Sequence, residues 1–234
     1  FLMQMPTIAI LDGDIIAYKL ACKVDVYGDE YLLQNIREYV ASWTPYECNE
    51  AVLAFSCSRE DNYRRKYWPA YKEHRSSVSK PVSMIDVIDS MKALYKIAYT
   101  PHLEADDLMG KEASGERAIA VTIDKDLRCT PGWHWNPDKE WEPRYVTVEQ
   151  ADRFFYKQWL MGDSTDKIPG IPKVGPVKAD RLLEQNSPAN WEAIVMAEYE
   201  KRGLTEEYAL SQATSVRILR DKEEPCLWQT SWMV

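Results

Sequence analysis

Short apolar runs alternate with segments of helical spacing along the first half of the chain. The runs at residues 7–11, 51–55 and 118–126 are typical of buried strands, and the first and third end in acidic residues. Apolar residues recur at helical spacing over about 31–43 and 82–99, and another helix begins within 103–110. The order strand, helix, strand, helix, strand predicts an α/β core with a mainly parallel central sheet.

The second half of the chain follows a different pattern. Residues 133–146 alternate apolar and polar around Asn136 and Pro137, which predicts a β-hairpin. Thr147 and Gln150 have the spacing of a capping box and predict a helix that ends near Met161. From residue 162 onward the sequence holds no further strand pattern. We therefore expect an α/β core over 1–161 and a helical lobe over 162–234.

Composition indicates a protein with a sizeable core and no membrane anchor. Hydrophobic residues make up 45% and charged residues 28% of the 234 residues, which suits one substantial domain with a smaller lobe. No apolar run approaches the roughly 18 residues of a membrane helix, and no secretory signal is recognisable. Five cysteines without a C-x-x-C pair favour free thiols in a reducing cytoplasm. Three scattered histidines argue against a histidine-based zinc site.

The net charge of −8 is unusual for a protein that binds nucleic acid. Its distribution changes the picture, because nine acids occupy four tight clusters and the remainder of the chain is nearly neutral. The nine are Asp12, Asp14, Glu104, Asp106, Asp107, Asp124, Asp126, Asp163 and Asp166. The excess negative charge is therefore concentrated at a few places along the chain.

The positions of these acids indicate a metal site. Asp12 follows one predicted strand, and Asp124 and Asp126 follow another; ligand sites of parallel sheets lie at such strand ends. Crowded carboxylates repel one another unless cations intervene, and oxygen ligands suit Mg²⁺ or Mn²⁺ rather than zinc. Two such ions about 3.5–4 Å apart can hydrolyse a phosphodiester. Helix capping or solvated loops would explain any single pair of acids, but four clusters in consistent places favour metal binding.

Residues 162–183 contain two glycine turns followed by a predicted helix near Pro176. Gly170 and Gly175 would let backbone N–H groups approach a phosphate closely. The start of the helix, together with Lys173 and Lys178, would add favourable charge. The segment therefore predicts a hairpin that binds duplex DNA without reading its sequence. A plain corner between two helices is the alternative.

A basic and aromatic stretch covers residues 63–75, and a flexible loop is expected over 75–81. Bases can stack on tyrosine or tryptophan rings while cations hold phosphates. This composition predicts a contact with nucleic acid, and a charged surface helix is the alternative.

Taken together, five motifs resemble the 5′-nuclease superfamily, which includes flap endonucleases, the 5′-exonuclease domain of bacterial DNA polymerase I and bacteriophage exonucleases. The motifs are ILDGD, YKEHR, LEADDLMG, TIDKD and GDSTDKIPGIPKVGP; they follow the family's order and span about residues 8–183. The resemblance implies a PIN-like nuclease core, with a short arch at about 63–81, and a helical lobe that contains a helix-hairpin-helix-type DNA-binding motif. It also implies 5′-3′ exonuclease or flap endonuclease activity on DNA with a 5′ end, nick or flap.

The resemblance also assigns roles to residues. It implies two Mg²⁺ or Mn²⁺ ions held by Asp12, Glu104, Asp106, Asp107, Asp124, Asp126, Asp163 and Asp166. Lys72 and Arg75 would be the catalytic cations at the scissile phosphate. DNA contacts are expected from Arg64, Tyr71, Gly170, Lys173, Gly175 and Lys178, with K⁺ as a further ligand of the hairpin.

One assignment brings helix geometry and family pattern into conflict. Ideal geometry places Glu104 and Asp107 on one helix face, whereas the family pattern pairs Glu104 with Asp106. We follow the family here, because Glu104 lies at the helix start, where the backbone need not be regular.

Three departures from the family pattern leave alternatives open. Ser56 stands where many relatives carry Asp, with Asp61 as a substitute, and Lys173 stands where Gly is usual. The segment between Arg75 and about residue 82 is short, which predicts a small or open arch. The compact size and these departures resemble bacteriophage enzymes. A bacteriophage protein would act in the host cytoplasm. The alternatives are a ribonuclease of RNA–DNA hybrids on the same fold, a toxin-like ribonuclease, which would lack the hairpin, and a non-catalytic DNA-binding module.

Overall fold

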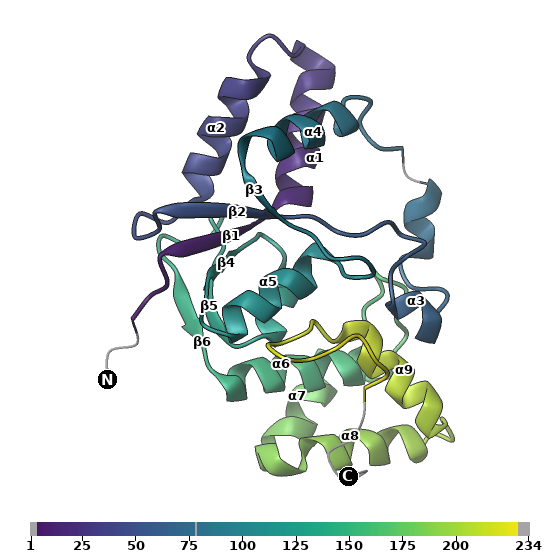
Figure 1. The fold of residues 1–234 in the computed structure, drawn as a ribbon. Coiled ribbons are helices and arrows are strands. Elements are labelled where there is room, and N and C mark those ends of the chain that lie inside the picture. Colours follow the sequence, from purple (N-terminus) through teal and green to yellow (C-terminus); the bar gives the residue numbers. More distant parts are fainter. Residues whose placement is uncertain (1–3, 78, 229–234) are drawn as a thin grey trace.

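A mainly parallel sheet lies at the centre of the molecule, for which a computed structural model describes residues 4–77 and 79–228 (Figure 1). Within these ranges its strands are β1 (Ile8–Asp12), β2 (Glu50–Ala54), β3 (Lys96–Ala98), β4 (Ile119–Val121), β5 (Gly132–Trp135) and β6 (Arg144–Val146). Their order across the sheet is β3-β2-β1-β4-β5-β6, and only the pair β5–β6 is antiparallel. The predicted α/β class with a mainly parallel sheet is confirmed.

Helices cover both faces of this sheet and continue beyond it. They are α1 (Gly13–Tyr27), α2 (Leu32–Trp43), α3 (Arg64–Tyr67), α4 (Met84–Leu94), α5 (Ala105–Ser114), α6 (Val148–Met161), α7 (Pro176–Glu184), α8 (Trp191–Glu200) and α9 (Glu206–Val216). Short 3₁₀ turns lie at Glu73–Ser77, Lys125–Cys129 and Pro188–Asn190. In the described part of the chain, no helix has the length and apolarity needed to cross a membrane.

Strand β1 shows how the two faces are built. Successive side chains of a strand point to opposite faces. Ala9 and Leu11 therefore join one buried cluster with α1, α2 and α4, whereas Ile10 joins another with α5 and α6. Figure 1 shows α1, α2 and α4 on one side of the sheet and α5 to α9 on the other. Because β1 is buried on both faces, its carboxyl end is held firmly in place.

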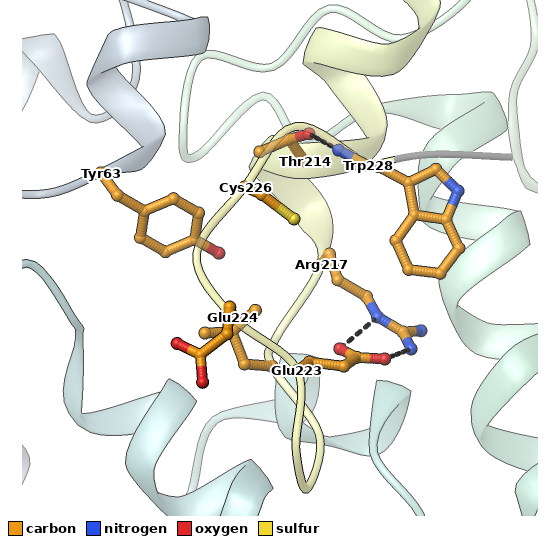
Figure 2. Close-up of a pocket in the computed structure, with 8 residues that line it drawn as sticks. Tyr63, Thr214, Arg217, Glu223, Glu224, Cys226 and Trp228 are labelled. Atoms are coloured by element: carbon orange, nitrogen blue, oxygen red, sulfur yellow. Dashed lines mark hydrogen bonds and ion pairs between the residues drawn. The ribbon is translucent and has the colours of Figure 1, made fainter.

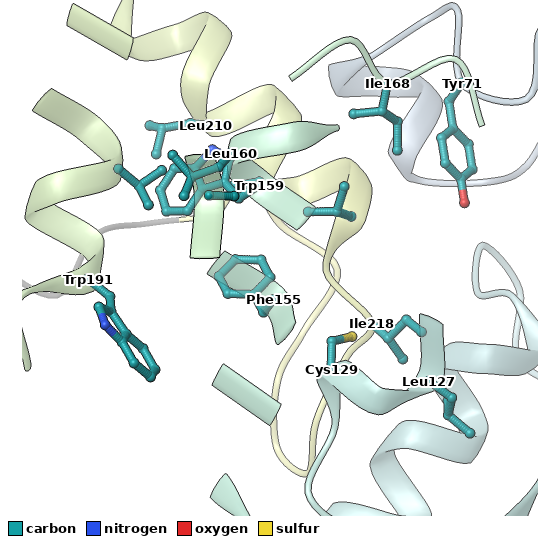
Figure 3. Close-up of a cluster of buried hydrophobic side chains, with 14 of the residues drawn as sticks. Tyr71, Leu127, Cys129, Phe155, Trp159, Leu160, Ile168, Trp191, Leu210 and Ile218 are labelled. Carbon is teal, nitrogen blue, oxygen red and sulfur yellow. The ribbon is translucent and has the colours of Figure 1, made fainter. Parts of the chain in front are cut away.

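The second cluster continues from the sheet into helices α6 to α9. Phe155 and Trp159 of α6 are fully buried within it, close to α8 and α9 (Figure 3). The Trp159 indole N–H donates to the carbonyl of Ala209 at 2.7 Å, and the Tyr199 hydroxyl donates to the carbonyl of Trp159 at 2.6 Å. The helices after residue 162 thus share an apolar core with the sheet. Our division into two units at residue 162 stays a prediction.

Two elements differ from the sequence-based predictions. No helix was predicted directly after the first strand, but α1 begins at Gly13 because the Asp12 carboxylate caps it, accepting the Ile15 N–H at 3.1 Å. The helix predicted over 82–99 ends at Leu94, and residues 96–98 form β3 beside β2. Pattern reading could not separate the two, because the helical spacing of apolar residues continues into this edge strand.

Two other predictions are confirmed. Residues 132–146 form the expected antiparallel hairpin, as β5 and β6. The capping box of α6 is also present, with the Gln150 N–H donating to Thr147 Oγ1 at 3.2 Å and the Thr147 N–H donating to Gln150 Oε1 at 2.9 Å.

Candidate active site

Most of the predicted acids meet in one small cavity of about 30 Å³. Its acidic lining residues are Glu104, Asp106, Asp124, Asp126, Asp163 and Asp166, and Lys72 lies among them. They come from the start of α5, the turn after β4 and the segment between α6 and α7. Segments far apart in sequence therefore bring their carboxylates together, as the motifs predicted.

Two strand ends place acids at or beside this cavity: Asp124 lines it, and Asp12 lies close enough to raise the pKa of Asp106. Strands β1 and β4 are hydrogen-bonded neighbours, so the acids that follow them, Asp12 and Asp124, emerge at the same edge of the sheet. The Thr122 hydroxyl donates to Asp12 Oδ2 at 2.9 Å, and the Asp126 N–H donates to Asp124 Oδ1 at 2.9 Å. Both acids thus have a fixed orientation before any ligand binds.

Glu104 lies where the chain supplies its own cations. Its carboxylate accepts hydrogen bonds from Lys72 at 2.7 Å, the Tyr71 hydroxyl at 2.8 Å and Arg64 at 3.1 Å. Burial alone would raise the pKa of Glu104, but the charges of Lys72 and Arg64 lower that pKa to about 2. Glu104 is therefore ionised at neutral pH and fully paired.

Lys72 and Arg75 converge on Asp166. The Arg75 guanidinium donates to Asp166 Oδ1 at 2.8 Å, and Lys72 Nζ lies 3.6 Å from Oδ2. Burial still raises the pKa of Asp166, against the pull of both cations. The Lys72 backbone has a φ of 51°, and its N–H donates to the carbonyl of Asp166 at 3.0 Å. A non-glycine residue in this left-handed region is strained, and such strain clusters at functional sites.

The opposite half of the cavity is poor in cations. Burial, followed by the charge of Asp14, raises the pKa of Asp12 to about 7. Burial and the charges of Asp12 and Asp124 raise the pKa of Asp106 well above its ordinary value. Among the residues that the structure describes, none donates a hydrogen bond to the Asp106 carboxylate. Asp106 thus remains an unpaired acid facing other acids.

This half fits a divalent cation by its chemistry. Its ligands are all carboxylate oxygens, buried and mutually repelling, which is the donor set that Mg²⁺ and Mn²⁺ prefer. In the side-chain positions observed for 4–77 and 79–228, no group of three His, Cys, Asp or Glu residues is close enough together to hold a metal. Side chains of the protein fill part of the space instead, since Lys125 Nζ lies 2.8 Å from Asp126 and 3.7 Å from Asp163.

Asp107 and Arg64 do not have the predicted roles. Asp107 is fully buried, and its two oxygens accept the Arg64 guanidinium at 2.6 and 2.7 Å. Asp107 also accepts the N–H groups of Glu104 and Leu219 at 3.1 Å each. Arg64 is 1% exposed. The predictions of a metal ligand at Asp107 and a DNA contact at Arg64 are wrong, because each neutralises the other inside the core.

Tyr71 and Gly170 also differ from expectation. Tyr71 is 4% exposed with its hydroxyl on Glu104, so its ring is not available for stacking on a base. Gly170 is buried, and a Cβ there would lie 2.2 Å from the backbone nitrogen of Gly162. The glycine at position 170 thus permits two backbone segments to cross closely and does not face a phosphate.

The end of the hairpin is open to solvent. Gly175 caps the start of α7, and a Cβ there would meet open space. Lys173 and Lys178 are exposed on either side of it. Their contact with DNA stays a prediction.

Sequence reasoning missed Gln158 of α6. Its side-chain N–H₂ donates to Asp126 Oδ1 at 2.8 Å, and its amide oxygen is buried at the cavity with no partner in the described structure. Gln158 is only 6% exposed. The available signal was a polar residue between the apolar Phe155 and Trp159, on the buried side of an amphipathic helix.

The departure at Ser56 has a local explanation. The Ser56 hydroxyl accepts the Ala105 N–H at 3.0 Å at the start of α5, and the Ser56 N–H donates to Asp14 at 3.0 Å. Asp61 contacts Ser58 on the surface and does not replace the missing carboxylate.

A separate cavity of about 220 Å³ lies under the segment that follows α9 (Figure 2). Arg217 lies between the rings of Phe155 and Trp228, at 4.8 and 4.5 Å from their centres, and pairs with Glu223 at 2.5 Å. The Trp228 N–H donates to Thr214 Oγ1 at 2.7 Å. Of the described residues that line this cavity, none belongs to the predicted site, so these contacts secure the segment rather than provide chemistry.

Comparisons with known proteins agree with the motifs. No family model matches the sequence. The exonuclease of Escherichia phage T7 is 28% identical over 204 residues, which cover 75% of this chain and 66% of the relative. Flap endonuclease Xni of Shewanella baltica is 27% identical over 180 residues, covering 67% of each protein. The chain is therefore similar in sequence to exonucleases and flap endonucleases, as the resemblance of its motifs to the 5′-nuclease superfamily predicted.

A solved structure of the superfamily shares the fold. The flap endonuclease of bacteriophage T5, in a pseudo-enzyme–product complex with DNA and metal ions, has a TM-score of 0.61 at 12% identity, with 89% of this chain and 88% of that chain covered. The chain spans about two thirds of the length of the two sequence relatives, at 66% and 67%. The similarity to exonucleases and flap endonucleases is therefore one of sequence, and the fold agrees with it.

Proposed function

We propose that the protein is a metal-dependent 5′-3′ exodeoxyribonuclease and flap endonuclease that hydrolyses DNA phosphodiesters. The observation that carries this proposal is the meeting of six carboxylates with Lys72 in one cavity at the carboxyl end of the sheet. Relatives named exonuclease and flap endonuclease support the reaction. The DNA and metal ions in the structure from phage T5 support the substrate and the cofactor.

Within this proposal, the acids around Asp106 would hold two Mg²⁺ or Mn²⁺ ions, with Lys125 displaced from Asp126 and Asp163. The ligands would be Asp12, Asp106, Asp124, Asp126 and Asp163. Bound ions of this kind lower the pKa of a water and stabilise a leaving oxygen. Lys72 and Arg75 neutralise the charge that develops on the phosphate, and Glu104 keeps Lys72 in place. The product carries a 5′-phosphate.

Duplex DNA would be held away from the chemistry. Lys173 and Lys178, exposed beside Gly175 at the start of α7, would contact backbone phosphates, and the helix N-terminus would favour the same anion. A K⁺ ion at this hairpin is part of the proposal and is tested by exchanging K⁺ for Na⁺ in binding assays. The free cysteines support action in a reducing cytoplasm, the host cytoplasm if the gene is of phage origin.

The proposal is tested with one panel of labelled substrates. Blunt duplex, nicked duplex, 5′-flap and RNA–DNA hybrid would be incubated with Mg²⁺, and the products resolved by length. We expect cleavage from the 5′ end or at the flap junction, with the DNA substrates preferred over the hybrid.

Controls separate the alternatives. Excess EDTA should abolish all cleavage, and Mn²⁺ should restore it. Cleavage of the hybrid alone would replace the proposal with a hybrid ribonuclease, and DNA binding without cleavage in Mg²⁺ and Mn²⁺ would leave a binding module. Cleavage at the full rate in excess EDTA would refute the metal-dependent mechanism.

A further inference from the structure

A second polar cavity, of about 200 Å³, lies beside the acidic one and shares Asp124 with it. It lies at the ends of β4 and β5 and the start of β6, and Lys72 is not among the described residues that line it. Its charged lining residues are Asp124, Lys125, Arg128, Lys139, Glu140 and Arg144. Cations thus outnumber acids in its wall, the reverse of the neighbouring cavity.

Glu140 holds the two arginines of this wall in place. Its Oε1 lies 2.9 Å from Arg144 Nε and 3.9 Å from the Arg128 guanidinium, and its Oε2 accepts the Asn136 N–H at 2.9 Å. The arginine side chains remain 47% and 42% exposed. One carboxylate therefore orients two guanidinium groups without covering them.

Lys139 adds a third cation at the rim. It is exposed, and no ion pair of the described residues involves its ammonium group. A surface network that existed only to pin the loop would gain little from a further unpaired charge, because exposed ion pairs contribute about 0–1 kcal/mol each. The surplus charge instead suits an incoming anion.

The floor of the cavity is consistent with this field. His134 is buried and lines the cavity, with Nε2 at 3.0 Å from the carbonyl of Thr130. Burial, together with the charges of Arg144 and Arg128, lowers the pKa of His134 to about 4. The floor is therefore neutral at physiological pH, and the cations of the rim determine the sign of the field.

We propose that Arg128, Lys139 and Arg144 form a phosphate-binding subsite for the DNA strand that passes through the acidic cavity. It takes a backbone phosphate next to the scissile one, on the β5–β6 side of Asp124. Arginine suits this ligand because its planar fork binds phosphate oxygens in pairs. The proposal rests on the proposed nuclease function and adds a second contact to the same strand.

The first test measures DNA affinity without chemistry. Fluorescent 5′-flap DNA would be titrated in EDTA at several salt concentrations, with the parent and Arg128→Gln/Lys139→Gln. Each lost phosphate contact should reduce the slope of log K against log salt by about 0.9. The matched control is Lys23→Gln/Arg37→Gln, which removes two exposed cations from α1 and α2. The control should retain the parental slope.

The second test locates the phosphate. Flap substrates with a single neutral methylphosphonate at successive positions would be bound by the parent and the variant. We expect one or two positions near the cleavage site to weaken the parent about tenfold while leaving Arg128→Gln/Lys139→Gln unaffected, because the contact is already lost. If the double variant folds poorly, Lys139→Gln alone can be used, because the Lys139 side chain is exposed and its loss should not disturb the fold.

The outcomes separate this subsite from the nuclease assignment. If the parent neither binds nor cleaves DNA, the proposed function has failed. If the parent does both and the variant has the same salt slope and the same response to every methylphosphonate, the subsite is refuted. Protection of the parent by inorganic phosphate in thermal melts, without any position-dependent effect on the strand, would reassign it to free phosphate.

Discussion

The two halves of the acidic cavity differ in the source of the positive charge that neutralises their carboxylates. Glu104 is paired with Lys72 and Arg64, and its pKa falls to about 2. Asp12 lies among other acids, and burial with the charge of Asp14 raises its pKa to about 7. The same residue chemistry thus gives opposite protonation behaviour within one site.

This difference indicates that the two halves of the cavity have different roles. In the first half the folded chain provides the counter-charges, so this half is complete before any ligand binds. In the second half, burial and the repulsion of Asp12 and Asp124 outweigh the attraction of Lys72 and raise the pKa of Asp106. A cation from solution would therefore favour its ionisation. Substitutions in either half of the cavity should therefore have different effects on metal binding, stability and cleavage.

The largest effect is expected from Asp106→Asn. Loss of a ligand from the cation-poor half should remove several kcal/mol of transition-state stabilisation, which lowers the single-turnover rate on the order of a thousandfold. Metal-free DNA binding should equal or exceed that of the parent, because one repulsive charge is gone. Thermal melts with and without Mg²⁺ provide the control, and a parental Mg²⁺ shift would contradict the role of Asp106.

Arg64→Met tests the buried pair below the cation-rich half. It leaves the fully buried Asp107 carboxylate without its partner, which should cost about 3–5 kcal/mol in the free energy of unfolding. Urea denaturation measures the loss. The double variant Arg64→Met/Asp107→Leu should recover most of it, since no unpaired charge remains. Equal instability of both variants would mean that packing, and not charge, dominates here.

Lys72→Met removes the counter-charge that the chain supplies to Glu104. A preorganised cation is worth about 3 kcal/mol in the transition state, so the single-turnover rate should fall roughly a hundredfold. Duplex affinity should change little, because the exposed lysines of the hairpin are expected to make those contacts. Parental cleavage by this variant, in the presence of normal Mg²⁺ binding, would exclude Lys72 from the chemistry.

The pH dependence of stability should report on Asp12. Burial raises the pKa of Asp12 from its ordinary value of 3.8 to about 7 in the folded chain, so the folded state binds the proton more tightly. Without divalent ions, the free energy of unfolding should therefore fall as pH rises from about 4 to 7, by about 3 kcal/mol. Asp12→Asn should flatten this part of the profile, as should Mg²⁺. Equal slopes for variant and parent would show that Asp12 is not the titrating group.

Gln158→Leu should give the smallest effect. Gln158 orients Asp126 without being an acid, and groups that orient metal ligands are worth about tenfold or more in metal affinity. Calorimetric titration with Mn²⁺ measures the change, with the stability of the variant as control. Gln158→Glu should bring a further repulsive charge and raise the amount of Mg²⁺ needed. Unchanged affinity in both variants would leave Gln158 a packing residue.

Sequence predicted the parts of this site that depend on local order. Asp12 and Asp124 could be placed at one edge because each follows an apolar strand, and parallel strands end together. The pairing of Glu104 with Asp106 in the cavity came from family pattern, and the helix start explains why ideal geometry failed there: Glu104 is the N-cap of α5.

The remaining features depend on contacts between distant segments. The Arg64–Asp107 pair joins residues 43 positions apart, and nothing in the basic stretch distinguishes Arg64 from its exposed neighbour Lys66. Gly170 was assigned to phosphate approach because a glycine turn has the same sequence pattern whether it faces solvent or, as here, another backbone. Burial of Tyr71 likewise follows from where Glu104 lies in space.

The last residues of α9 and the first residues after it complete the acidic cavity and the pairing below it. Ser215, Val216 and Ile218 line the cavity, and the Leu219 N–H completes the contacts of Asp107. On the ribosome, a nascent chain carries all its acidic motifs by residue 166 but lacks this wall until some fifty residues later. The acidic motifs alone therefore cannot complete the cavity, which also needs residues that are made later in translation.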